Sequence, residues 1–250
     1  MLTPEICIPN HLKCFGGGNY KTDNQIQKGN IMKTPQERKA LSEQKIKAKG
    51  IGIFAGLPCI ESADDVTMKS KDAICKRAVA ALLSTQIACD ISEQQYDGVK
   101  FFIDLMKKFG VFETLNEKEK HLVSGMFDQR DVVDVVWEYE CFWSLAWALG
   151  LVEDISDASR ICDCAKAVHL VADCDSFETF CQNCKPRDIE EILDMLDLYY
   201  RYHWACVQNM HVDKNLPIGD LNMEVVFERR RGLEWLISQE DDWHEIALHT

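Results

Sequence analysis

The sequence lacks the motifs by which common catalytic sites are recognised. None of its serines lies in a Gly-x-Ser-x-Gly elbow, and no His-Glu-x-x-His pair is present. The triplet Gly16-Gly17-Gly18 lacks the Lys-Ser/Thr ending and the preceding strand of a phosphate-binding loop. The motifs therefore name no activity, and we predict neither a cofactor nor a bound metal.

Long apolar runs are also missing. The longest stretch, Cys141 to Val152, has twelve residues and is interrupted by Ser144 and Gly150. A membrane span needs about 20 residues, so this stretch predicts a buried helix and no membrane partner. The start of the chain shows no basic region followed by an apolar one, as a secretory signal would. We therefore expect a soluble, cytoplasmic protein whose 12 cysteines are reduced thiols.

Basic residues are in the minority. The chain has 28 Lys and Arg against 41 Asp and Glu, for a net charge of −13. Residues 1–50 hold nine basic and four acidic groups, whereas residues 51–250 hold 19 and 37. Because so acidic a body repels phosphate, we expect no nucleic-acid partner. A basic protein partner suits this charge.

What is present indicates helices. Residues 1–31 show no periodicity and predict a flexible leader, so residues 32–250 are expected to form a single α-helical domain. Apolar residues recur at helical spacing over about 70–89 and 96–109. The pattern Thr114-x-x-Glu117 predicts a capping box for a short helix that Gly125 ends. Residues 51–66 allow at most a short pair of strands. The fold class is therefore mainly α.

A tryptophan-rich segment over 134–150 predicts the central helix of this domain. Past Cys141 it is apolar on every side, which is typical of a helix packed all round. Glu140 lies at the threshold of that stretch and needs a nearby cation, for which Arg201 and Arg229 are the candidates. The three consecutive arginines 229–231 cannot all face one way, so at least one should turn inward towards an acid.

These residues resemble the uncharacterised, mainly bacterial domain of unknown function family 4272. The resemblance rests on Trp137-x-x-Glu140-x-x-Trp143-x-Leu145-x-Trp147-Ala148-Leu149-Gly150, on Arg187-x-x-x-Glu191-Ile192-Leu193-Asp194-x-x-Asp197-Leu198-Tyr199-Tyr200-Arg201-x-His203-Trp204, on Val226-x-Glu228-Arg229-Arg230-x-x-Leu233-x-Trp235-Leu236, and on the closing Trp243 to Thr250. It implies a single α-rich domain and little more, because the family has no established activity. His244 and His249 depart from it, since the family pattern has acidic residues there.

Two groups of residues are candidates for a site. The first is a polar set made of Glu140, Arg187, Glu191, Asp194, Asp197, Arg201, His203 and Arg229. These side chains either line a pocket for a charged small molecule or form buried ion pairs that fix helix register, and we favour the ion pairs. The second is a set of cysteines, Cys162-x-Cys164, Cys174 and Cys181-x-x-Cys184, whose spacing fits a zinc site poorly.

Two functional classes therefore remain open. The first is a non-enzymatic binding or interaction protein with an acidic surface. The second is a small-molecule enzyme or sensor that uses the buried Glu/Asp/Arg/His cluster. A concave pocket at Glu140, Asp194 and Arg201 would favour the second class, and a flat acidic face would favour the first.

Overall fold

The computed structural model describes residues 32–250, which form helices joined by loops. In chain order the helices are α1 (Pro35–Ala48), α2 (Lys71–Ser92), α3 (Val99–Lys108), α4 (Glu117–Ser124), α5 (Gln129–Ala148), α6 (Cys164–Ala172), α7 (Phe177–Asn183), α8 (Ile189–His211) and α9 (Met223–Trp235), with 3-10 turns η2 (Phe112–Thr114) and η3 (Trp243–Glu245). No strand occurs in this part of the chain, which confirms the mainly α prediction. The predicted leader, 1–31, lies outside the described residues.

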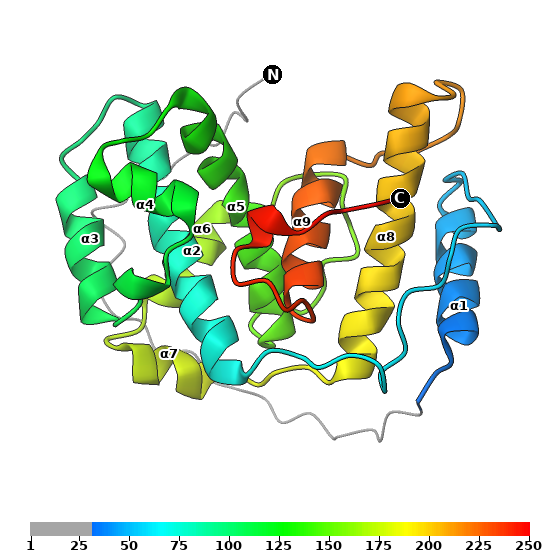
Figure 1. The fold of residues 1–250 in the computed structure, drawn as a ribbon, viewed down its shortest axis with the longest axis horizontal. Coiled ribbons are helices and arrows are strands. Elements are labelled where there is room, and N and C mark those ends of the chain that lie inside the picture. The colour runs from blue at the N-terminus through cyan, green and yellow to red at the C-terminus, as the bar shows by residue number, and fades with distance from the viewer. Residues whose placement is uncertain (1–31) are drawn as a thin grey trace.

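The helices are arranged side by side, from α3 and α4 at one end to α1 at the other (Figure 1). Helix α5 lies in the middle and packs against α2 on one side and α9 on the other, and α8 packs against both α9 and α1. Every residue from 138 to 149 of the tryptophan-rich segment is buried in one continuous core, which confirms its central position. None of the described helices has the length and apolar content that crossing a membrane requires.

A glycine lets α9 approach α5 closely. A Cβ atom on Gly232 would lie 2.9 Å from the carbonyl oxygen of Cys141 and 3.1 Å from the Cβ of Ser144, closer than packed side chains allow. The Ser144 hydroxyl donates to the Arg229 carbonyl at 3.0 Å across the same contact. Gly232 therefore brings the arginines of α9 against the acidic residue of α5.

Two local expectations are corrected. The capping box of α4 is formed by Asn116 and Glu119, because the Thr114 hydroxyl donates to the Val111 carbonyl within η2 instead. The strand pair allowed near 51–66 does not form. There, the carbonyl groups of Ala55 and Leu57 accept hydrogen bonds from the side chain of Lys39. This side chain thus supplies hydrogen bonds that the backbone of a neighbouring strand would otherwise donate.

Candidate functional site

The eight residues of the polar set do not gather at one place. They form separate contacts instead. Glu140 lies 2.7 Å from Arg229, Asp197 lies 2.7 Å from Arg201, and Arg187 lies 3.0 Å from Glu191. Asp194 lies 2.6 Å from Lys33 and 3.1 Å from Arg38, and His203 lies 2.6 Å from Arg230. Burial and the neighbouring Arg230 lower the pKa of His203 to about 4, so it is neutral near pH 7. Ion pairs, some within or at the start of α8 and some between helices, therefore account for all of the set except His203.

The contact between Glu140 and Arg229 confirms that Glu140 pairs with an inward-facing arginine. Both side chains are almost wholly buried, with exposed fractions of 1% and 3%. Glu140 Oε2 accepts from Arg229 Nε, and Glu140 Oε1 accepts from the backbone N–H of Cys162 at 2.6 Å. Burial alone would lower the pKa of Arg229, but the adjacent Tyr199 and Glu140 raise it. The guanidinium is therefore charged near neutral pH.

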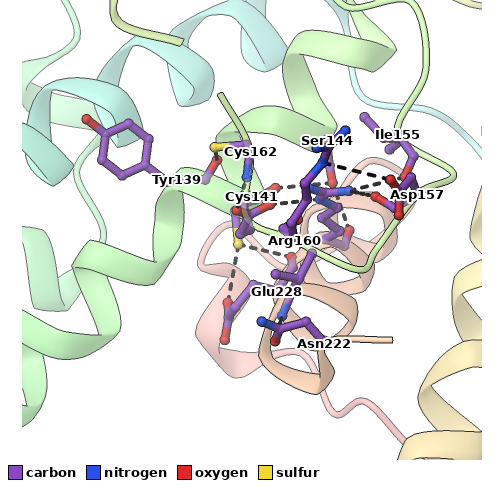
Figure 2. A network of polar contacts seen from close by, with 12 residues as sticks. Tyr139, Cys141, Ser144, Ile155, Asp157, Arg160, Cys162, Asn222 and Glu228 are labelled. Atoms are coloured by element: carbon purple, nitrogen blue, oxygen red, sulfur yellow. Dashed lines mark hydrogen bonds and ion pairs between the residues drawn. The ribbon is translucent and has the colours of Figure 1, made fainter. Parts of the chain in front are cut away.

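Arg229 directs its remaining N–H groups to the α5–α6 loop, residues 149–163. Its Nη1 donates to the carbonyls of Ile155 (3.3 Å) and Asp157 (2.6 Å), and its Nη2 donates to that of Arg160 (3.2 Å). Figure 2 shows these three loop residues converging on the same network. A backbone segment of 15 residues without regular structure is long for a compact fold. The buried pair supplies hydrogen bonds that a helix or sheet would otherwise give.

The rest of the loop backbone is held in the same way. Arg187 Nη2 donates to the carbonyls of Val152 at 3.1 Å and Glu153 at 3.0 Å. Lys49 Nζ donates to the carbonyl of Ser156 at 3.2 Å, and the backbone N–H at 222 donates to the carbonyl at 158 at 2.9 Å. Arg229 of α9, Lys49 directly after α1, Arg187 before α8 and the backbone before α9 thus fix one loop.

With its carbonyl groups engaged, the loop presents its carboxylates to solvent. Four acidic residues of the loop, Glu153, Asp154, Asp157 and Asp163, are exposed. Asp154 and Asp157 accept from the backbone N–H groups two residues further on, which fixes the backbone of local turns. Hydrogen bonds from Ser159 lower the pKa of Asp157, so it remains ionised near neutral pH. The site is therefore a fixed acidic loop.

A cavity of about 480 Å³ opens beside this loop. Its lining comprises Trp143, Asp154, Asp157, Arg160, Ile161, Cys162, Asp163 and Arg229. Arg160 is 84% exposed and lies 3.9 Å from Asp157, so it is only loosely paired. Carboxylates around an indole ring form an environment that suits an ammonium or guanidinium group.

Two other cavities border the polar set. One of about 540 Å³ lies between α1 and α8 and has Glu191 and Asp194 in its lining, and one of about 270 Å³ includes His203. Glu140 and Arg201 line none of the three cavities. Of Glu140, Asp194 and Arg201, the residues whose surroundings were to separate the two functional classes, Asp194 is the one that borders any of these three cavities.

Sequence reasoning missed a second buried network, around Arg77 of α2. Arg77 forms an ion pair with Glu119. Glu138 of α5 accepts from Asn116 at 2.9 Å and lies 2.9 Å from His244 Nε2. Burial and the adjacent Glu138 together raise the pKa of Glu119 to about 7, although Arg77 opposes both. Two features of the sequence could have indicated this network: Arg77 in an otherwise apolar helix, and Glu138, a second glutamate two residues before Glu140.

The candidate zinc cysteines are divided between separate places. The sulfur atoms of Cys162 and Cys164 lie 4.0 Å apart. Cys174, in contrast, contacts Asn183, and Cys181 interacts with Cys75 of α2. Burial and the Cys75 thiol raise the pKa of Cys181 to about 12, so it is a thiol near neutral pH. Among residues 32–250 no group of three or more potential ligands is arranged to hold a metal ion.

Comparison with known proteins gives a family but no activity. The model of the family described as Domain of unknown function (DUF4272) matches residues 38–246. Neither the curated proteins nor the solved structures give a match. The matched range includes the whole fixed loop and both buried networks.

Proposed function

The chain belongs to this family of unknown function, and we propose that it is a non-enzymatic binding protein whose α5–α6 loop receives a basic segment of a partner protein. One observation carries the proposal. The backbone carbonyls of the loop accept hydrogen bonds from Arg187 and Arg229, which holds the exposed carboxylates in place. Among these carboxylates, Asp157 has a loose ion pair, 3.9 Å from Arg160. A preorganised acidic surface loses little conformational freedom when it binds.

The charge distribution between core and surface supports the same proposal. Five arginines and five carboxylates are buried in residues 32–250: Arg38, Arg77, Arg201, Arg229 and Arg230, with Glu119, Glu138, Glu140, Glu190 and Asp197. Because these buried groups are equal in number, the acidic excess of residues 32–250 lies on side chains outside the buried core. Such a surface speeds encounter with a basic partner and repels acidic ones.

The cavity beside the loop gives the proposal a specific contact. A lysine or arginine side chain of the partner enters next to Trp143 and is surrounded by Asp154, Asp157 and Asp163. The loosely paired Arg160 moves aside, because its ion pair within the described residues is a 3.9 Å contact at an exposed site.

A peptide-binding measurement tests this proposal. The probe is a nine-residue oligoarginine peptide, with an oligolysine peptide and an oligoglutamate peptide of the same length for comparison. The test variant carries Asp154→Asn, Asp157→Asn and Asp163→Asn, which removes three charges but keeps the side-chain oxygens of the turns and of the α6 cap. The control carries Asp213→Asn, Asp220→Asn and Glu224→Gln, at three exposed positions elsewhere.

We expect the loop variant to bind oligoarginine about tenfold more weakly than the wild type, from three charge contacts of up to about 1 kcal/mol each. The control variant should lose less than about threefold, since it removes only long-range attraction. Equal losses in the two variants would show that the overall charge, and not this loop, attracts the peptide. Calorimetric titration at two salt concentrations gives the affinities.

A cytoplasmic location belongs to the proposal as well. The ten cysteines of the described residues are free, as is usual in a reducing compartment. Fractionation of cells that express the protein tests this point, and recovery from the secreted or membrane fraction would contradict it.

A further inference from the structure

The cavity between α1 and α8 shares Asp154 with the lining of the basic-partner site but is otherwise formed by different residues, and we propose that it binds a small organic anion with an apolar body, such as an aromatic carboxylate. Its volume of about 540 Å³ is in the range of small-molecule sites. The floor is formed by buried side chains that include Trp147 and Leu198. An apolar ring of a ligand therefore has an apolar and aromatic surface to cover.

The carboxylates of α8 at this cavity are already neutralised. Glu191 pairs with Arg187 at 3.0 Å. Asp194 pairs with Lys33 at 2.6 Å and with Arg38 at 3.1 Å. They consequently contribute little net negative charge to a ligand in the cavity.

The lysines on the opposite wall are not neutralised. Lys45 of α1 and Lys49, which directly follows α1, both line the cavity, and neither forms an ion pair with a carboxylate of the described residues. Lys49 Nζ is fixed by the Tyr202 hydroxyl at 3.0 Å and the Ser156 carbonyl at 3.2 Å. An ammonium has three donors, so one N–H of Lys49 remains for a ligand.

These features together define the ligand. Its anionic group lies at the α1 wall between Lys45 and Lys49, and its apolar body covers Trp147 and Leu198. Asp154, on the loop side of the cavity, disfavours a second anionic group there. A compact monoanion is thus preferred over a phosphate-rich or dianionic ligand.

The test compares three probes of one shape: 3-phenylpropionate, its neutral amide 3-phenylpropanamide, and the cation 3-phenylpropylamine. The test variant is Lys45→Gln, because Lys45 is exposed and its side chain holds no other element in place. The matched control is Lys47→Gln, an exposed lysine on the same helix that does not line the cavity. A second variant, Ala48→Trp, fills the cavity from its exposed rim.

We expect the carboxylate to bind at least about fivefold more tightly than the amide, and the amine to bind most weakly. Lys45→Gln should reduce carboxylate affinity about fivefold and leave amide affinity unchanged, while Lys47→Gln changes neither. Ala48→Trp should abolish binding of both. The proposal is overturned if no probe binds up to its solubility limit, if the amine binds best, or if the two lysine variants behave alike. Ligand-observed NMR titration measures the affinities, and circular dichroism checks the fold of each variant.

Discussion

Glu138 and Glu140 lie two residues apart on α5, yet they enter buried networks of different kinds. Glu140 meets one arginine, and each of its oxygens accepts a hydrogen bond. Glu138 shares Arg77 with Glu119, so two carboxyl groups face one guanidinium, and Glu138 Oε2 has no hydrogen-bond partner. The first network is electrically balanced, whereas the second has more carboxyl groups than cations.

The difference explains what each network does for the protein. The balanced pair holds a loop, because Arg229 has N–H groups left for the carbonyls of Ile155, Asp157 and Arg160. The unbalanced one joins α2, α4 and α5 and retains a proton, because two carboxylates beside one cation cannot both ionise without cost. We therefore expect the first to govern loop structure and the second to govern the pH dependence of stability.

The largest expected effect comes from the balanced pair. Glu140→Gln leaves the Arg229 guanidinium buried without a counter-charge, which should lower the free energy of unfolding by about 3–5 kcal/mol. The double variant Glu140→Gln, Arg229→Met removes the stranded charge and should recover part of this loss. Chemical denaturation followed by circular dichroism measures both. A change of only a few tenths of a kcal/mol for Glu140→Gln would mean that the pair is not structural.

The second prediction concerns Glu119 and pH. Its pKa is about 7 in the folded protein against 4.5 for an ordinary glutamate, so the folded state binds more protons between these values. The stability that this proton confers is complete below about pH 4.5 and is lost as the pH rises to about 7. Relative to Glu119→Gln, the free energy of unfolding of the wild type should therefore fall by up to about 3 kcal/mol over this window.

The comparison with Glu119→Gln is necessary because buried histidines act in the opposite direction. Burial and neighbouring arginines lower the pKa values of His203 and His244 to about 4, so acidification below about pH 6.5 destabilises the folded state through them. Their contribution cancels in the difference between two proteins that share them. Denaturation curves at pH 5 and pH 8 suffice, with Glu117→Gln as an exposed control on the same helix. An unchanged difference at the two pH values would show that Glu119 holds no extra proton.

The smallest expected effect comes from the other end of the loop. Arg187→Met removes hydrogen bonds to the carbonyls of Val152 and Glu153, but Arg187 is half-buried and its partner Glu191 is 42% exposed. Water can replace these contacts, so the free energy of unfolding should fall by only about 1–2 kcal/mol. The exposed Arg160→Met should change it by less than about 0.5 kcal/mol. A loss for Arg187→Met as large as that for Glu140→Gln would contradict the expectation that the Glu140–Arg229 pair stabilises the loop more than Arg187 does.

Much of the fold follows from local signals in the sequence. The apolar surroundings of Glu140 required a cation, and the run of arginines at 229–231 supplied one. Of its two candidate partners, Arg201 is instead engaged by Asp197 one helical turn away. Whether Arg201 or Arg229 pairs with Glu140 depends on how closely α9 approaches α5 at Gly232, and no local sequence pattern specifies that distance.

The candidate site was harder to predict for a related reason. Loop residues 149–163 show no periodicity, and their partners Lys49, Arg187 and Arg229 come from distant parts of the chain. The network around Arg77 was missed because Glu119 lies in a short helix whose sequence is mostly polar, where an exposed glutamate is expected. The burial of Glu119 depends on the contact between α4 and α2. Burial of a polar side chain is a tertiary property, so sequence periodicity alone could not identify these residues.

The most direct test of this account is the hydrogen exchange of the loop. Exchange is measured by mass spectrometry in the wild type, in Glu140→Gln, and in Ile74→Ala, which removes a buried side chain of α2 and lowers global stability away from the loop. We predict that segment 151–163, including the Cys162 amide, is protected in the wild type and in Ile74→Ala but exchanges much faster in Glu140→Gln. Equal loop protection in the two variants would contradict the claim that the Glu140–Arg229 pair holds the loop.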